Sequence, residues 1–388
     1  MRRYLSRRDF IKLAGLGLGA MAFTPITAHD IDFRWSIFSQ PKRLPQFPGS
    51  AIIGRVTEPD VDIRNRPTND PNLNTSVGKL GADSLVEWSR EVLGNVVGGL
   101  STQRYVETPQ GYVYAPVVQL TRNQPNTPVT ELPNGQGFWA EVTVPYVELA
   151  HDGQVASPWL QDHITYNFPP RLYYGQVVWI DQVRTSNGFP EYRWNEDAYG
   201  KGYGYGAYGE FFWADGAGLK ILTEDELTPI NPNVDPNEKT ISVDLDYQTL
   251  SCFEGTREVF FSRISSGKKY DPVTGIVTDE YATPAGTLFT HWKIISKNMT
   301  AGSVGAGYST PAVPWCTFIS GEGIAIHGAF WHNAFGERRS HGCINVSTED
   351  AKWIFRWTTP YISLAQSEER KSLPDHGTII NSTETVFL

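Results

Sequence analysis

The side chains that could do chemistry gather in one stretch of the sequence, RRSHGCINV, residues 338–346. Ser340, His341, Gly342 and Cys343 are adjacent there, in a chain that contains only three cysteines. A thiol becomes a strong nucleophile when an imidazole takes its proton, as in cysteine enzymes that transfer acyl groups. On an extended segment His341 and Cys343 would project to the same side, because they are two residues apart. The motif therefore identifies Cys343 as a candidate nucleophile.

A second imidazole could reach the same sulfur. His327 ends the apolar run GIAIHG and lies 13 residues before Ser340, so only folding can bring it to Cys343. Gly342 permits a tight backbone turn that could aim N–H groups at a developing oxyanion. Together these residue types point to acyl transfer through a cysteine.

A zinc site is the main competing assignment for these residues. Histidine and cysteine are common zinc ligands, and the region offers four of them: His327, His332, His341 and Cys343. The chain contains no C-x-x-C or H-x-x-x-H pair, so the sequence favours the nucleophile. Cys343 taken alone could also be a buried apolar residue or half of a disulfide. For the acyl-transfer chemistry we expect neither a metal nor an organic cofactor.

The composition is that of a globular protein whose partners are not nucleic acids. The chain has 388 residues, of which 40% are hydrophobic and 13% aromatic, enough for two or three domains with hydrophobic cores. The formal net charge of -9 at pH 7 repels the phosphates of nucleic acids and anionic lipids.

The N-terminus has the pattern of an export signal. Basic residues precede an apolar, glycine-rich run over residues 11–23, which is shorter than the roughly 20 residues that span a bilayer. SRRDFIK, residues 6–12, is similar to the twin-arginine signal of proteins that are exported after folding. We therefore expect residues 1–28 to be a signal peptide, and the rest to work in the cell envelope, the periplasm or the cell wall. An uncleaved signal would remain as a membrane tether.

The cysteine count leaves one thiol without a partner inside the chain, because three is an odd number. Cys252 and Cys316 could form a disulfide, which would leave Cys343 free. They could equally be two buried free thiols, and the sequence does not distinguish the two arrangements.

Short strands dominate the chain after the signal. An extended lead-in covers residues 29–50, and alternating apolar and polar residues in VDIRNRP and GYVYAPVVQL predict strands within a module over residues 51–123. This module resembles a bacterial SH3-like barrel. A second β module of the same kind, over residues 136–230, contains two strands joined by a turn at Ser186–Pro190. Its run of tyrosines and glycines, residues 199–213, could stack on sugars or form a surface insertion.

The final domain, residues 239–382, is predicted to be mostly β with one short helix. Its first strand has apolar residues at alternate positions, namely Ile241, Val243 and Leu245. The chain then turns at Glu254-Gly255 into a second strand. Directly after the cysteine motif, Ser347 can cap a helix, and three residues would form its apolar face: Ala351, Ile354 and Phe355.

The segment HGAFWHNAFGERRSHGCINV, together with TPAGTLFTHWK upstream, resembles the signature of YkuD-type L,D-transpeptidases. The resemblance covers residues 239–382 and centres on the SHGC core. It implies a mainly β chain whose C-terminal L,D-transpeptidase domain is a β-sandwich or barrel, preceded by the two SH3-like modules.

The resemblance also implies roles for individual residues. Cys343 would attack the carbonyl between a diamino acid and the terminal D-alanine of a peptidoglycan stem peptide. His327 would accept and return the proton. His341, supported by Ser340, would orient the thiol and stabilise the thiolate. The N–H groups of Gly342 and Cys343 would form the oxyanion site. Trp331 and Asn345 would contact the substrate. Transfer of the acyl group to a second stem peptide would form a 3→3 cross-link.

Three other outcomes stay open at this point. Water as the acceptor would make the enzyme a carboxypeptidase, and a protein amine as the acceptor would attach a protein to the wall. A chain with a vestigial catalytic domain would instead be a non-catalytic wall-binding protein.

Overall fold

The computed structural model describes residues 42–385, except for 96, 98–101, 152, 154–156, 167, 200–201, 204–209, 272–274, 302–307 and 372–376. The predicted signal peptide and most of the predicted lead-in lie outside the described residues, as does much of the tyrosine- and glycine-rich run. Among the described residues, no helix is both long and apolar enough to cross a membrane.

Two small sheets form the first unit of the fold. One has three strands in the order β4 (Leu85–Glu87), β1 (Ile53–Val56) and β8 (Val118–Thr121). The other has five, in the order β3 (Ser76–Leu80), β2 (Val61–Arg64), β7 (Gly111–Tyr114), β6 (Arg104–Thr108) and β5 (Arg90–Leu93). A 3-10 turn, η2 (Ala115–Val117), separates β7 from β8. The apolar side chains of both sheets form a core of their own, which includes Val56, Val106, Val113 and Val118.

The second unit repeats this plan. β9 (Phe138–Val142) lies between β12 (Val177–Ile180) and β18 (Leu219–Ile221), as β1 lies between β4 and β8. The five-stranded sheet has the order β11 (Arg171–Tyr173), β10 (Tyr146–Ala150), β17 (Phe211–Asp215), β14 (Phe189–Asn195) and β13 (Gln182–Ser186). A 3-10 turn, η4 (Gly216–Gly218), precedes β18 as η2 precedes β8. The predicted turn at Ser186–Pro190 joins β13 to β14, with Asn187 and Gly188 both at positive φ.

A helix in this second unit was not expected from the sequence. α3 (Pro158–Thr165) begins after Ser157, whose hydroxyl accepts the N–H of Leu160 at 3.1 Å, and Pro158 occupies its first turn. Leu160 is its only buried residue, so the apolar periodicity is too weak to indicate a helix. The Ser157-Pro158 pair was the available signal.

The third unit has two sheets. The first has the order β21 (Arg257–Arg263), β20 (Thr249–Glu254), β19 (Lys239–Asp244), β28 (Ile379–Thr383) and β22 (Gly286–Phe289). The second runs β16 (Gly202–Tyr203), β15 (Ala198–Tyr199), β23 (Trp292–Ala301), β24 (Tyr308–Phe318), β25 (Ala325–Gly328) and β26 (Ile344–Val346), and β27 (Glu368–Arg370) pairs with β23. One apolar core joins residues of both sheets to α4 (Thr348–Trp357).

The predicted single strand from residue 239 to Glu254 is wrong, because the chain turns twice. Asp244 ends β19, and its carboxylate accepts the N–H groups of Asp246 and Tyr247, each at 2.9 Å. This side-chain bonding makes a local turn between β19 and β20. The predicted turn at Glu254-Gly255 is the second one, between β20 and β21.

Helix α4 lies where the sequence predicts a helix, and its two ends are well satisfied. Ser347 accepts the N–H of Asp350 at 3.0 Å at the start. At the other end two buried lysines donate to carbonyls of the last turn: Lys239 to Trp357 at 3.1 Å and Lys293 to Thr358 at 2.9 Å. The helix is thereby fixed directly behind β24 and β25.

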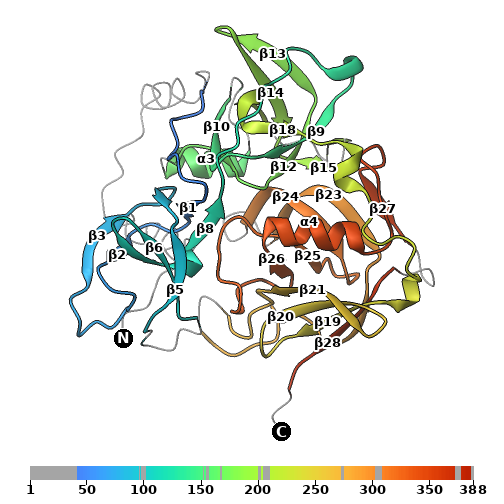
Figure 1. Cartoon of the computed structure of the whole chain (residues 1–388). Helices are drawn as coiled ribbons and strands as arrows, with labels where there is room; N and C mark the ends of the chain where they lie inside the picture. Colours follow the sequence, from blue (N-terminus) through green and yellow to red (C-terminus); the bar gives the residue numbers. More distant parts are fainter. Residues whose placement is uncertain are drawn as a thin grey trace.

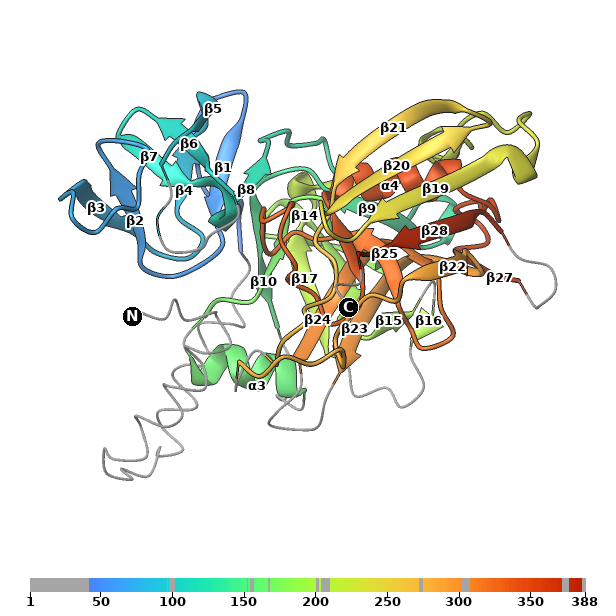
Figure 2. The same ribbon diagram turned by 90° about the horizontal axis from the view of Figure 1, so that it is seen from below.

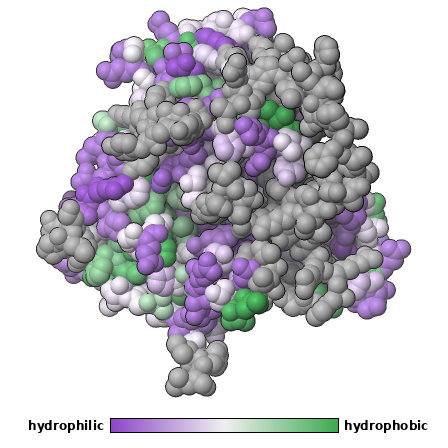
Figure 3. All heavy atoms as spheres, turned by 180° about the vertical axis from the view of Figure 1, so that it is seen from behind, coloured by the Kyte–Doolittle hydropathy of each residue, from purple (hydrophilic) through white to green (hydrophobic). Residues whose placement is uncertain are grey.

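Figure 1 shows the three units packed against one another, with the first in blue and cyan, the second in green and the third in yellow to red. Seen from below in Figure 2, the first unit lies to one side of the third, and β10 and β17 of the second lie between them. The coloured atoms of the face in Figure 3 are mainly hydrophilic, with hydrophobic residues in separate small groups.

Candidate active site

Two neighbouring strands bring Cys343 and His327 to one face of a sheet. β25 and β26 are parallel, and His327 is paired with Asn345. Paired residues point to the same face, and so do residues two apart along a strand. Cys343 lies in the bend ahead of β26 and packs against the apolar cluster that contains Ala325, which is two residues before His327 on β25 and so shares its face. The pairing of β25 with β26 therefore brings His327 close to the motif, which the spacing in the sequence could not establish.

The turn that carries the nucleophile is held by its own side chains. Gly342 has a φ of 114°, a conformation that residues with a Cβ rarely adopt. Ser340 Oγ accepts the Gly342 N–H at 3.1 Å and donates to the Cys343 carbonyl. Thr283 Oγ donates to the Gly342 carbonyl at 2.7 Å and accepts the Gly267 N–H at 2.8 Å. These bonds satisfy the backbone on both sides of the sulfur and fix its position.

The Cys343 thiol is accessible and neutral at rest. The residue is only partly buried, and its sulfur lies 3.9 Å from the Gly323 carbonyl oxygen. The low-polarity surroundings of the sulfur raise the pKa of Cys343, because they disfavour the thiolate. The expected stabilisation of the thiolate by His341 stays a prediction.

His327 is a buried, neutral imidazole with a defined orientation. It is 3% exposed, and burial lowers its pKa to about 4. Its Nδ1 lies 3.2 Å from the Gly328 carbonyl oxygen, so Nδ1 carries the proton and donates it there. The other nitrogen, Nε2, is left with a lone pair that can accept a proton. No hydrogen bond between His327 and Cys343 is present among the described residues; in unliganded sites such bonds commonly form only with the substrate.

Trp331 and His341, also predicted as site residues, each make a ring contact. The Trp331 ring is 5.8 Å from the His327 ring, and Trp331 and Cys343 pack against the same apolar cluster. The His341 ring meets Tyr281 edge-on at 4.8 Å. Residues 341–343 form a bend rather than an extended strand, so the predicted same-side projection of His341 and Cys343 does not follow.

Asn345 and His332 are buried and contact each other. Asn345 is 3% exposed, and its amide is 3.2 Å from His332 Nε2. His332 Nδ1 accepts the Ala334 N–H at 3.1 Å. The Asn345 amide thus faces His332, and its predicted contact with substrate stays a prediction. Among the described residues, no three His, Cys, Asp or Glu side chains are arranged to hold a metal ion.

All three cysteines are free thiols, so the disulfide alternative for Cys252 and Cys316 is wrong. Cys252 belongs to β20 and the main core of the third unit. Cys316 belongs to β24 in the other sheet and to the apolar cluster against which Trp331 and Cys343 pack. Burial raises the pKa of both thiols well above the usual value. Cys343 is the one cysteine of the three that is not fully buried.

Sequence reasoning missed Thr283 and Tyr281, which contact the motif from a segment about 60 residues upstream. Thr283 begins TPAGTLFTHWK, so its presence in that segment was the available signal. Sequence reasoning also missed the hydrogen bonds that Arg55 and Arg104 of the first unit donate to the carbonyls of Phe330 and Asn333, for which the sequence contains no signal.

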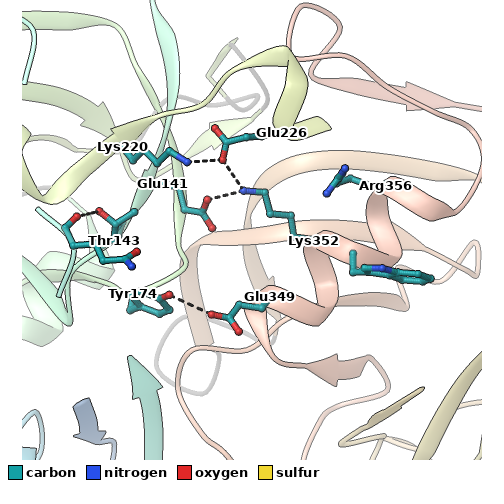
Figure 4. A pocket seen from close by; sticks show the side chains of 11 residues that line it. Glu141, Thr143, Tyr174, Lys220, Glu226, Glu349, Lys352 and Arg356 are labelled. Carbon is teal, nitrogen blue, oxygen red and sulfur yellow. Dashed lines mark hydrogen bonds and ion pairs between the residues drawn. The ribbon is translucent and has the colours of Figure 1, made fainter. Parts of the chain in front are cut away.

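Two cavities lie away from the sulfur. One of about 310 Å³ separates the second unit from α4, and one of about 260 Å³ separates the first unit from the third. Cys343 lines neither. In the larger one the charges pair with one another, because Lys352 donates to Glu141 at 2.8 Å and to Glu226 at 3.2 Å (Figure 4).

Comparison with known proteins identifies the third unit. Residues 238–378 match the family model of the YkuD L,D-transpeptidase catalytic domain. The probable L,D-transpeptidase 3 of Mycobacterium tuberculosis is 37% identical over 83 residues, which cover 20% of this chain and 31% of that protein. The chain thus matches about a third of the length of this curated relative.

Solved structures give weaker likenesses. An L,D-transpeptidase from Mycobacterium smegmatis is 16% identical with a TM-score of 0.30, over 53% of this chain and 98% of that one. L,D-transpeptidase 3 from Mycobacterium tuberculosis, solved with a faropenem-derived adduct, is 17% identical with a TM-score of 0.29, over 54% and 91%. The assignment therefore rests on the family model: residues 238–378 form a YkuD-type L,D-transpeptidase catalytic domain.

Proposed function

We propose that the chain is an exported L,D-transpeptidase that joins peptidoglycan stem peptides through a thioester on Cys343. The observation that carries this proposal is that the Cys343 thiol packs against the same apolar cluster as Trp331, whose ring lies 5.8 Å from the ring of the neutral His327, and that the Gly328 carbonyl holds the Nδ1 proton of this imidazole. Nucleophile, base and a group that orients the base are the three parts that such catalysis needs.

In the first half-reaction, His327 Nε2 takes the thiol proton while the sulfur attacks the carbonyl carbon between the diamino acid and the terminal D-alanine. The pKa of Cys343 is raised and that of His327 is lowered, so the thiol still carries its proton and the imidazole can accept it when the substrate binds. The Gly342 N–H is bonded to Ser340 Oγ, so we assign stabilisation of the oxyanion to the Cys343 N–H. His327 then returns the proton to the amine of D-alanine, the C–N bond breaks, and a thioester remains on Cys343.

In the second half-reaction, the side-chain amine of another stem peptide attacks the thioester. His327 accepts a proton from that amine and returns one to the departing sulfur. The product is a 3→3 cross-link, and Cys343 is restored as a thiol. Trp331 forms a wall beside the base where the stem peptide would lie.

The test is mass spectrometry of muropeptides after incubation of the purified protein with disaccharide tetrapeptides. We expect dimers joined between two third-position residues, and none with Cys343→Ala. Shortened monomers alone would mean that water is the acceptor. No change in any muropeptide, with a correctly folded protein, would contradict the proposal and favour a non-catalytic wall-binding role.

A further inference from the structure

The first unit holds the backbone that connects the two halves of the active site. This connecting segment, residues 329–339, runs from the end of β25 to the SHGC motif. Residues of the first unit contact it through five hydrogen bonds or ion pairs: Arg55 Nη2 to the Phe330 carbonyl (2.6 Å), Arg104 Nη2 to the Asn333 carbonyl (2.7 Å), the Asn333 N–H to the Pro116 carbonyl (2.8 Å), Asn333 Nδ2 to the Ala115 carbonyl (3.2 Å), and Arg339 to Glu58 (3.1 Å).

Arg55 makes the most buried of these contacts. It is 1% exposed, and its guanidinium donates to Asp83 at 2.6 Å and to Gln119 at 2.7 and 2.9 Å, besides the Phe330 carbonyl. A guanidinium has a fixed, planar set of donors, so the bonds to Asp83 and Gln119 determine where the remaining N–H points. Arg55 is thereby oriented rigidly toward the connecting segment.

The second unit completes the same cluster. The Arg55 guanidinium lies 3.9 Å from the centre of the Tyr173 ring, and Tyr173 also stacks on Phe330 with ring centres 5.8 Å apart. The Tyr173 hydroxyl donates to Asp83 at 3.0 Å, and Arg171 pairs with Asp83 at 2.9 Å. We call these residues the Arg55 cluster: Arg55, Asp83, Gln119, Arg171 and Tyr173. Its charges are paired, which is the condition for keeping them buried.

The bond to the Phe330 carbonyl acts directly on Trp331. That oxygen belongs to the planar peptide group that links Phe330 to Trp331, so fixing it fixes the backbone at the start of Trp331. The Phe330 and Trp331 rings also meet edge-on at 5.0 Å, and Trp331 lies 5.8 Å from the His327 ring. An unbroken series of contacts therefore leads from a buried arginine of the first unit to the wall beside the base.

We propose that Arg55 is a positioning residue of the active site, which acts through Phe330 to hold Trp331 against His327. This inference rests on the proposed function, since it concerns the same thiol and base. It gives the N-terminal units a part in the rate of the reaction, besides whatever they bind.

The experiment measures acylation of the full chain by imipenem, a carbapenem, in Arg55→Lys and in Trp331→Phe, singly and together. Arg55→Lys keeps the positive charge but loses the planar guanidinium and its several N–H donors. We expect the second-order rate constant of acylation to fall about tenfold, because small misplacements of residues near reacting groups lower rates by this much or more. In the Trp331→Phe background the same change should cost less than about threefold, since coupled residues are not additive. Arg90→Lys, an exposed arginine of the same unit paired with Glu107, is the matched control and should leave the rate unchanged.

The outcomes separate the two proposals. No acylation of the wild-type chain would remove the proposed function. Normal acylation with an unchanged Arg55→Lys rate, or an equal fall in both backgrounds, would overturn the role of Arg55 alone. If Arg55→Lys does not fold, Tyr173→Phe takes its place, because it removes only the hydroxyl that bonds Asp83. It should slow acylation about twofold to threefold in the wild-type background only, and an equal or absent effect would contradict the proposal.

Discussion

The reacting pair, Cys343 and His327, and the Arg55 cluster differ in how they accommodate ionisable groups away from water. Cys343 and His327 have no ionic partner among the described residues, and their surroundings shift both pKa values toward the neutral forms. The Arg55 cluster keeps its charges, because each is paired within hydrogen-bonding distance.

The difference separates chemistry from support. A neutral thiol and a neutral imidazole can exchange a proton during the reaction, since neither is locked in an ion pair. A change of protonation in a buried ion pair has a high free-energy cost, because it leaves the partner charge unpaired. Such pairs instead hold the atoms that they contact in one geometry. The connecting segment contacts both groups: Phe330 bonds to Arg55, and the Trp331 ring lies 5.8 Å from the His327 ring.

Removal of the base should have the largest effect on rate. In His327→Ala, acylation by imipenem should slow by about 10²–10⁴-fold, the usual contribution of a positioned base. His341→Ala is the matched variant and should have a much smaller effect, because its ring faces Tyr281. The rates are compared by stopped-flow fluorescence, after circular dichroism has shown that both variants fold. An unchanged rate in His327→Ala would transfer the role to His341.

Removal of one charge from the Arg55 cluster should have the largest effect on stability. Asp83→Asn leaves Arg55 and Arg171 without their shared carboxylate, and we expect the free energy of unfolding to fall by about 3 kcal/mol. Urea denaturation measures this. Asp60→Asn is the matched control, because Asp60 also has a positive φ and pairs with a cation, Lys79, but is exposed. Equal midpoints for the two variants would show that the cluster gains nothing from burial.

The pH dependence of acylation should reflect the unpaired burial of His327. The reaction needs the neutral imidazole, and burial lowers the pKa of His327 to about 4 from an ordinary value of 6.5. The rate should therefore hold as the pH falls through 6.5 and decline only near 4. The unfolded chain takes up this proton at the higher pH, so the same group makes stability decrease as the pH falls from 6.5 toward 4. A decline of the acylation rate already near pH 6.5 would contradict this, because it would show that burial does not lower the pKa of His327.

The smallest effect is expected at the other contact with the third unit. Lys352 on α4 pairs with Glu141 and Glu226 at the edge of the larger cavity, where all three side chains keep some exposure. Lys352→Ala should lower the free energy of unfolding by about 1 kcal/mol and leave acylation unchanged, because these residues do not contact the connecting segment. Urea denaturation and the imipenem rate check both statements. A loss as large as that of Asp83→Asn would remove the distinction between the buried and the open interface.

Local patterns predicted the elements that depend on local interactions. The Ser347 cap and the spacing of Ala351, Ile354 and Phe355 indicate α4, and Asn187-Gly188 lies in the predicted turn between β13 and β14. The turn after Asp244 was missed because the apolar alternation continues across it, while the turn itself depends on side-chain bonds to the backbone.

The candidate site was predictable in its residues but not in its geometry. The motif and the resemblance named Cys343 and His327, but the parallel pairing of β25 with β26 is what brings them together. The pKa directions depend on burial, which no spacing encodes. The contact from Arg55 to Phe330 joins residues 275 positions apart and uses a carbonyl, so the residue type at 330 contains no trace of it.

The most direct test of the central claim is the mass of the protein after incubation with imipenem, followed by peptide mapping. The account predicts one adduct on the wild-type chain, located on Cys343, and none on Cys343→Ala, since Cys252 and Cys316 are buried thiols with raised pKa values. An adduct on Cys343→Ala at the wild-type stoichiometry would show that the nucleophile is elsewhere.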